Sequence, residues 1–224
     1  MTVHIHTGPN ELADATARFI AGLVAAASDE FTIGFAGGST PETTYRVLRS
    51  LDVDWDRVVG WLSDERWVPP DHPESNGMMV ARTLLDHVSA PLFRPEWSED
   101  PVAAARIYDA TIRGLHAADP PDLVLLGMGS DGHVASLFPG TGALSEREHW
   151  IVANRVPQLE TFRITVTYPL LEAAGQVVVI VAGDSKSEAL AAVAAGSSDM
   201  PAAPIWTAPN ADWFMDTAAA SLLP

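Results

Sequence analysis

Residues 123–133 read Leu-Val-Leu-Leu-Gly-Met-Gly-Ser-Asp-Gly-His, an apolar run that leads directly into a glycine-rich loop. A short, uninterrupted run of branched apolar residues is typical of a strand buried on both faces, as in a parallel sheet. Glycines at positions 127, 129 and 132 let the loop adopt an unusual backbone path and expose its N–H groups. The stretch therefore predicts a buried parallel strand with a functional loop at its carboxyl end.

Similar apolar runs alternate with helical patterns on both sides of this stretch. Further strands are predicted at residues 31–36, 58–63, 163–167 and 177–182, and helices at residues 10–28, about 41–51, 76–86, 101–116 and 186–195. Alternation of apolar strands with helices indicates a parallel sheet covered on both faces. The 224 residues fit one large domain, so we expect a Rossmann-like α/β domain over residues 1–224, built on a single doubly wound, mostly parallel sheet with helices on both faces.

Composition and charge limit the class of protein and its partners. Apolar residues make up 47% of the chain and charged residues 19%, as expected for a globular domain. The formal net charge of −16 argues against a nucleic-acid partner, because binding to phosphate backbones needs a basic face. The absence of cysteine excludes disulfides, thiolate nucleophiles, iron–sulfur clusters and cysteine-based zinc sites.

No membrane segment is expected from the sequence. The most apolar stretch, residues 176–182, is far too short to span a bilayer. The first residues carry no charged segment followed by an apolar run, so no signal peptide is expected. We therefore expect a cytoplasmic location and no membrane partner.

Four polar motifs follow predicted strands, which is where ligands bind in parallel α/β sheets. The first is Gly37-Gly38-Ser39-Thr-Pro-Glu42, in which the paired glycines let the backbone approach a ligand closely. Ser39 and Glu42 have the spacing of a capping box, and the free N–H groups of the helix start would suit an anion. The motif lacks the pattern of a dinucleotide site or a P-loop, and a capped turn without any ligand would have the same sequence.

The second motif is Asp64-Glu-Arg66, with Ser75 and Asn76 a short way downstream. A guanidinium group matches phosphate geometry and can form two hydrogen bonds to it, so Arg66 is a candidate phosphate ligand. Asp64, Ser75 and Asn76 are candidate polar contacts to the rest of a substrate. A local ion pair on a solvated rim remains the alternative for the two adjacent carboxylates.

The third motif is the loop at residues 127–133. His133 can act as a general base or acid near neutral pH, and the backbone N–H groups around Gly129 and Gly132 are what an oxyanion needs. Asp131 either orients His133 or contacts a sugar hydroxyl. The other six histidines lack this setting and are interpreted as surface or packing residues.

The fourth motif, Gly183-Asp-Ser-Lys186, follows the most apolar predicted strand. A lysine at the start of a helix opposes the helix dipole, and a bound phosphate would reverse the local sign. Lys186 is therefore a candidate phosphate ligand, with a surface lysine as the alternative. Arg163, which opens a predicted strand, is a weaker candidate of the same kind. No metal-binding or cofactor motif stands out, so no metal and no cofactor are predicted.

Taken in order, these motifs resemble the 6-phosphogluconolactonase family, which shares a superfamily with glucosamine-6-phosphate deaminase. The resemblance rests on residues 34–41, 64–69, 75–76, 127–140, 163–167 and 183–186, and it extends to residues 213–216. It implies a glucosamine-6-phosphate deaminase-like fold and metal-independent hydrolysis of 6-phosphoglucono-1,5-lactone in the oxidative pentose phosphate pathway. It further implies that His133 is the catalytic histidine and that Arg66 and Lys186 bind the phosphate, with Arg163 near the same site.

The resemblance also implies a mechanism that these residues can perform. His133 takes a proton from water as the water attacks the lactone carbonyl, and it then protonates the departing ring oxygen. Backbone N–H groups of residues 37–38 or 129–132 stabilise the oxyanion. Because the lactone also hydrolyses spontaneously in water, one general base with good positioning is a sufficient catalyst.

One segment departs from the family pattern. Residues 156–163 read Val-Pro-Gln-Leu-Glu-Thr-Phe-Arg, and Gln158 stands where a lysine is common in the family. Contact between substrate and the loop at residues 157–161 therefore stays open, and Arg66 and Lys186 carry more of the expected phosphate binding. The expected partner is a small phosphosugar lactone, and both a monomer and a homodimer stay open.

Two other functions fit parts of the sequence. Glucosamine-6-phosphate deaminase carries an acidic residue a few positions after its Asp-Gly-His, whereas residues 134–138 here, Val-Ala-Ser-Leu-Phe, contain no carboxylate. Hydrolysis is therefore favoured over isomerisation. A non-catalytic sugar-phosphate sensor from a transcription regulator should carry a DNA-binding segment and a basic face, which disagrees with the net charge of −16.

Overall fold

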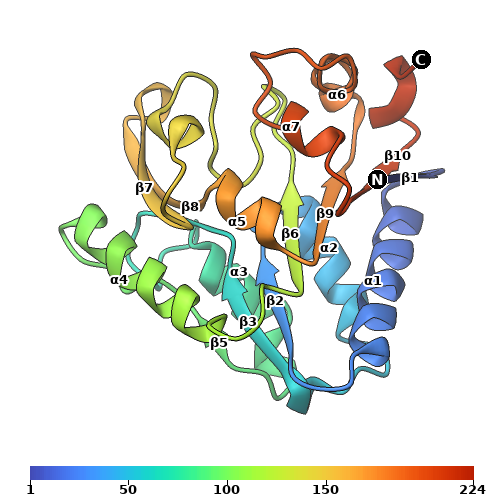
Figure 1. The fold of residues 1–224 in the computed structure, drawn as a ribbon. Coiled ribbons are helices and arrows are strands. Elements are labelled where there is room, and N and C mark those ends of the chain that lie inside the picture. Colours follow the sequence, from blue (N-terminus) through green and yellow to red (C-terminus); the bar gives the residue numbers. More distant parts are fainter.

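Short apolar runs form a central sheet of seven parallel strands in the computed structural model, which describes residues 1–224 (Figure 1). In spatial order the strands are β1 (Thr2–His6), β10 (Ala211–Asp216), β9 (Gln176–Val181), β6 (Leu123–Gly127), β2 (Phe31–Phe35), β3 (Val58–Leu62) and β5 (Leu92–Phe93). The strand predicted before the glycine-rich loop, β6, lies in the middle of this sheet. The expected α/β fold with a mostly parallel sheet is confirmed.

Helices cover both faces of the central sheet. They are α1 (Pro9–Ala26), α2 (Ser39–Leu48), α3 (Asn76–Thr83), α4 (Pro101–Leu115), α5 (Tyr168–Ala173), α6 (Ser187–Ala194) and α7 (Ala203–Trp206). Successive side chains of a strand point to opposite faces, so each strand contributes side chains to two hydrophobic cores, one on each face of the sheet. Leu123 and Leu125 pack with side chains of α1, α2 and α3, whereas Val124 and Leu126 pack with side chains of α4 to α7.

A second, smaller sheet accompanies the central one, and we call it the small sheet. It consists of β4 (Asp64–Arg66), β8 (Thr161–Val166) and β7 (Ile151–Val156), paired antiparallel in the order β4-β8-β7. The expectation of a single sheet is therefore incomplete. The strand predicted at residues 163–167 exists, but it pairs in the small sheet, because strand periodicity does not reveal a strand's partner.

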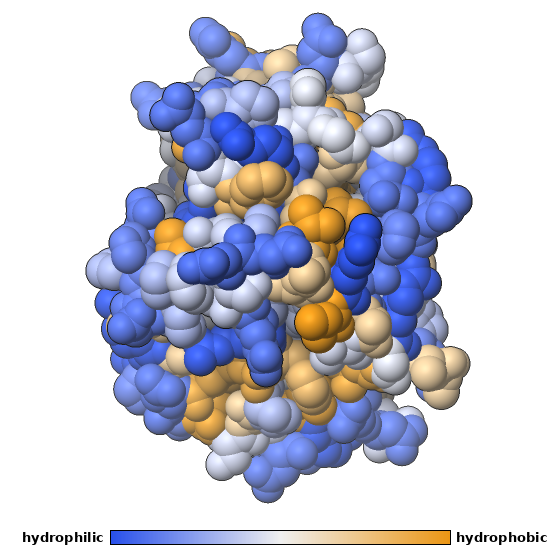
Figure 2. Space-filling view, turned by 90° about the vertical axis from the view of Figure 1, so that its left-hand side faces the viewer, coloured by the Kyte–Doolittle hydropathy of each residue, from blue (hydrophilic) through white to orange (hydrophobic).

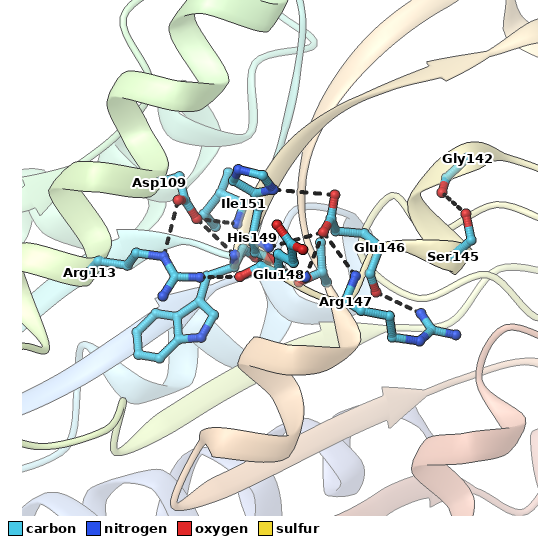
Figure 3. Close-up of polar contacts among 11 residues, drawn as sticks. Asp109, Arg113, Gly142, Ser145, Glu146, Arg147, Glu148, His149 and Ile151 are labelled. Carbon is cyan, nitrogen blue, oxygen red and sulfur yellow. Dashed lines mark hydrogen bonds and ion pairs between the residues drawn. The ribbon is translucent and has the colours of Figure 1, made fainter.

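Hydrogen bonds fasten α4 to the start of β7 (Figure 3). The buried carboxylate of Asp109 accepts the backbone N–H groups of Trp150 and Ile151, each at 2.8 Å. Arg113 donates from Nε to Asp109 Oδ2 at 3.1 Å, and its guanidinium lies over the ring of Trp150. The small sheet is thus held against α4 at one end.

The neighbouring turn makes stability depend on pH through Glu146. Backbone N–H groups of Glu148, His149 and Arg147 donate to Glu146 Oε1, and this lowers the pKa of Glu146 from its ordinary value of 4.5 to about 2 (Figure 3). A carboxyl group with a lowered folded-state pKa stabilises the fold above its unfolded pKa, and the benefit is lost as pH falls through its folded pKa.

We therefore predict that Glu146→Gln lowers the melting temperature at pH 7 but flattens its decline between roughly pH 4.5 and pH 2. Melting curves of both proteins across this range provide the measurement. Curves that run parallel for the two proteins would contradict a stabilising role for the ionised Glu146.

The outer face of α4 and the small sheet is mostly hydrophilic. Figure 2 shows this face, where polar residues surround and separate the apolar ones. Exposed apolar side chains on α4 include Val102 and Ile107. Scattered apolar side chains are ordinary on protein surfaces, so they define no partner. None of the helices combines the length and the apolar character that crossing a bilayer needs.

Candidate active site

A pocket of about 400 Å³ opens beyond the carboxyl ends of β2, β6 and β9, and residues of the small sheet form part of its wall. All four sequence motifs contribute to this wall. The lining residues are Gly37, Gly38, Ser39, Thr40, Pro41, Asp64, Arg66, Gly127, Met128, Gly129, His133, Ala135, Ser136, Phe138, Leu159, Arg163, Ile180, Ala182 and Lys186. Of the predicted site residues, those outside the lining are Ser75, Asn76, Asp131 and Gly132.

His133 has a fixed orientation at the pocket wall. Its Nδ1 atom lies 2.5 Å from Oδ1 of Asp131, and its ring stacks on Phe138 with the centroids 4.1 Å apart. Burial disfavours the charged form of Asp131, but hydrogen bonding to His133 and the electrostatic interaction with its ring outweigh this effect, so the pKa of Asp131 is lowered. An ionised carboxylate can only accept, so Nδ1 of His133 carries the proton and Nε2 remains free.

Glycine is required where the loop folds back on His133. A Cβ atom on Gly129 would lie 2.1 Å from His133 Nδ1, so no larger residue fits there. Gly132 adopts φ +75°, and its carbonyl accepts the N–H of Ala202 at 3.0 Å. Gly132 therefore shapes the loop from behind and does not face the pocket.

Three cations of the pocket have no carboxylate partner. No ion pair involves Arg66, Arg163 or Lys186. Arg66 and Arg163 lie directly opposite each other in the β4–β8 pair, and Nε of Arg163 is buried without a hydrogen-bond partner. Burial and then the charge of Arg66 lower the pKa of Arg163, against the opposing effect of Asp64. Like charges placed opposite each other in a sheet are unfavourable, and a bound anion would relieve this repulsion.

The first motif presents free backbone donors to the same pocket. The helix α2 begins after Gly38, which adopts φ +101°, and no side chain caps it. The predicted capping box between Ser39 and Glu42 is therefore wrong, because Ser39 is already the first helical residue. The N–H groups of Gly37 and Gly38 donate no hydrogen bond within the chain. They can serve an oxyanion or a phosphate oxygen.

Ser75 and Asn76 support the site from behind instead of lining it. Both are buried, at 2% and 1% exposure. Ser75 Oγ donates to Glu65 Oε2 at 2.9 Å, and Asn76 Nδ2 donates to Asp64 Oδ1 at 3.1 Å. The predicted polar residues are thus present, but they hold two adjacent carboxylates in place.

Glu65 accepts four hydrogen bonds, three of them from residues at the start of α3. Its carboxylate accepts the N–H groups of Arg66, Asn76 and Gly77 and the hydroxyl of Ser75, at 2.6–2.9 Å. Burial raises the pKa of Glu65, and these four hydrogen bonds oppose the rise. Glu65 therefore has a structural role that its position beside Asp64 in the sequence does not reveal.

We predict that Glu65→Ala destabilises the protein by about 3 kcal/mol, since buried donors left without partners cost about 1–3 kcal/mol each and water can satisfy some of them. Thermal melting should show a decrease of roughly 6–12 °C for a chain of this size. Glu96→Ala, at an exposed glutamate, is the matched control and should melt like the wild type. Equal melting temperatures for both variants would contradict the capping role.

Several pocket residues were not predicted from the sequence. They are Thr40, Pro41, Met128, Ala135, Ser136, Phe138, Leu159, Ile180 and Ala182. Phe138 carried a usable signal, because an aromatic ring in the same loop as a histidine can stack on it. The loop at residues 157–161 contributes Leu159 to the wall of the pocket. Ser136 lies among apolar residues in the sequence, and nothing in its local sequence identifies it as a pocket residue.

The chemistry available in this pocket is that of one oriented imidazole beside an anion site. Nε2 of His133 can accept a proton, free N–H groups can bind an oxyanion, and three cations can bind a phosphate. No group of three or more histidine, aspartate or glutamate side chains is arranged to hold a metal ion.

Comparison with known proteins places this chain among sugar-phosphate enzymes. A family model described as glucosamine-6-phosphate isomerases/6-phosphogluconolactonase matches residues 7–214. A 6-phosphogluconolactonase from Nostoc sp. is 38% identical over 205 residues, which cover 86% of this chain and 85% of the Nostoc protein.

Solved structures share the whole fold. The 6-phosphogluconolactonase from Trypanosoma brucei is 26% identical, with a TM-score of 0.89 over 100% of this chain and 98% of its own. A monomeric glucosamine-6-phosphate deaminase is 23% identical, with a TM-score of 0.87 over 99% of this chain and 100% of its own. The fold is therefore common to lactonases and deaminases, and it does not separate the two activities.

Proposed function

The chain belongs to the glucosamine-6-phosphate isomerase/6-phosphogluconolactonase family, and we propose that it hydrolyses 6-phosphoglucono-1,5-lactone to 6-phosphogluconate. The observation that carries this proposal is the shared pocket of His133 and three unpaired cations. Hydrolysis of a phosphorylated lactone needs a base that takes a proton from water and cationic groups that bind the phosphate. The identity of 38% to a protein named as this lactonase supports the same reaction.

In the proposed mechanism His133 is the general base. Asp131 fixes the ring through Nδ1, and Nε2 takes a proton from water while the water oxygen attacks C1 of the lactone. The carbonyl oxygen becomes an oxyanion, which the free N–H groups of Gly37 and Gly38 are suited to stabilise. When the bond between C1 and the ring oxygen breaks, the proton on Nε2 passes to that ring oxygen. The mechanism uses no metal and no cofactor.

The phosphate is assigned to Arg66, Arg163 and Lys186, with help from the start of α2. No ion pair joins any of these cations to a carboxylate, which supports this assignment, because a site for a dianion should not be neutralised in advance. Arg163 is a stronger candidate for phosphate binding than the sequence indicated, because its buried Nε has no hydrogen-bond partner within the chain. A net charge of −16 makes such a local cluster necessary for attracting an anionic substrate.

Two assays separate the proposed activity from that of the deaminases with the same fold. We expect the purified protein to accelerate loss of 6-phosphoglucono-1,5-lactone and to release no ammonia from glucosamine 6-phosphate. The physical reason is that residues 134–138 supply no carboxylate to the loop that follows His133. Ammonia release at useful rates, with no lactone hydrolysis above the spontaneous rate, would overturn the proposal.

A further inference from the structure

Ser136 joins the loop of His133 to every strand of the small sheet. Its hydroxyl donates to Asp64 Oδ2 on β4 at 2.7 Å, and its N–H donates to Thr165 Oγ1 on β8 at 3.0 Å. Its carbonyl accepts from Asn154 Nδ2 on β7 at 2.8 Å. Ser136 and its three partners are all buried, with exposures of 0–8%, so water competes little for these bonds.

The partners of Ser136 share one face of the small sheet with the two arginines of the pocket. Asp64 and Arg66 are two residues apart on β4, and Thr165 and Arg163 are two residues apart on β8, so each pair points to one face. Asp64 lies opposite Thr165, and Arg66 lies opposite Arg163. One face of the small sheet therefore carries two of the three proposed phosphate-binding cations, Arg66 and Arg163, together with the anchors of the loop.

The backbone conformation beside Ser136 indicates that the hydrogen bonds to the small sheet constrain the loop of His133. Ala135 adopts φ +47°, a left-handed conformation that a residue with a side chain adopts only at a cost in free energy. Such a conformation persists where the surrounding contacts determine it. Ser136, the next residue, makes three buried hydrogen bonds that can do so.

We propose that Ser136 is a positioning residue that fixes the distance between His133 and the phosphate-binding arginines, a role that rests on the proposed function. Ser136 does not have to touch the reacting atoms, because its hydroxyl is committed to Asp64. By holding the loop to the small sheet, it lets binding of the phosphate place the lactone carbonyl at Nε2 of His133. A substrate without phosphate gains nothing from this fixed distance.

The test compares two substrates, the phosphorylated lactone and unphosphorylated glucono-1,5-lactone. Ser136→Ala removes the bond to Asp64, and Thr165→Val removes the acceptor for the Ser136 N–H with little change in shape. Both variants should lower kcat for the phosphorylated lactone about 10- to 100-fold, the effect of a small misplacement, and should change hydrolysis of the unphosphorylated lactone little. Thr165→Ser keeps the hydroxyl and should behave like the wild type.

The controls separate positioning from general damage to the fold. Thr16→Val deletes a buried hydroxyl that donates to Leu12 at 2.8 Å in α1, outside the pocket, and should change neither rate. Rates that fall in proportion on both substrates for Ser136→Ala and Thr165→Val, or that do not fall, would overturn the positioning role. If Ser136→Ala fails to fold, the comparison of Thr165→Val with Thr165→Ser tests the positioning role. A wild type without lactonase activity would instead overturn the proposed function itself.

Discussion

Replacement of His133 by alanine is expected to lower kcat for the phosphorylated lactone about 10²- to 10⁴-fold, the usual contribution of a positioned general base. The expectation follows from the geometry of the ring. Nδ1 is held by Asp131 at 2.5 Å and the ring is stacked on Phe138, so only Nε2 is available to water in the pocket. KM should change little, because the cations that bind the phosphate lie on other elements.

The control for this variant is His87→Ala, at an exposed histidine outside the pocket. It should retain the wild-type rate and the wild-type KM. Binding of 6-phosphogluconate, followed by the rise in melting temperature, should survive in His133→Ala. If His133→Ala kept near-wild-type kcat, the imidazole would have no part in the chemistry.

Replacement of Arg66 by alanine is expected to act mainly on binding. KM for the phosphorylated lactone should rise about 10- to 100-fold, since a hydrogen bond between charged groups contributes about 1.5–3 kcal/mol. The unliganded protein should lose little stability, because Arg66 makes no ion pair, faces Arg163 in the pair of strands, and forms only an exposed hydrogen bond, from Nη1 to the Glu74 carbonyl at 2.8 Å. An unliganded variant as stable as the wild type, but with weakened binding, identifies a residue held in place for its ligand.

Hydrolysis of unphosphorylated glucono-1,5-lactone provides the internal comparison for Arg66→Ala, and it should be unaffected. Arg18→Ala, at an exposed arginine paired with Asp14 on α1, is the matched control and should leave both substrates unaffected. A fall in kcat with an unchanged KM for Arg66→Ala would contradict ground-state binding of phosphate by this residue.

The sequence predicted the parts of the site that depend on local pattern. An apolar strand followed by Gly127, Gly129 and Gly132 identifies a loop at a sheet edge, and His133 within it identifies a candidate base. Arg66 and Lys186 are predictable for a similar reason, because they follow predicted strands, whereas Arg163 opens a predicted strand and reaches Arg66 through the antiparallel pairing of β8 with β4. Apart from Arg163, these features need only the knowledge that strand ends meet at one edge of a sheet.

The parts that the sequence did not reveal depend on contacts between distant residues. Ser136 and Asp64 are 72 positions apart, and Ser136 and Thr165 are 29 apart. Ser75 and Asn76 are polar residues in a plausible place, yet their partners are Glu65 and Asp64, and only the fold shows this. The small sheet was not recognised because β4 is three residues long and carries Asp64 and Arg66 instead of apolar residues.

The most direct test of the proposed function is the rate at which 6-phosphoglucono-1,5-lactone disappears at early times. The lactone can be generated in place from glucose 6-phosphate by a glucose-6-phosphate dehydrogenase and followed with and without this protein. The proposed function predicts that catalytic amounts of the protein remove the lactone much faster than it hydrolyses spontaneously. A rate that stays at the spontaneous value at every protein concentration would contradict it.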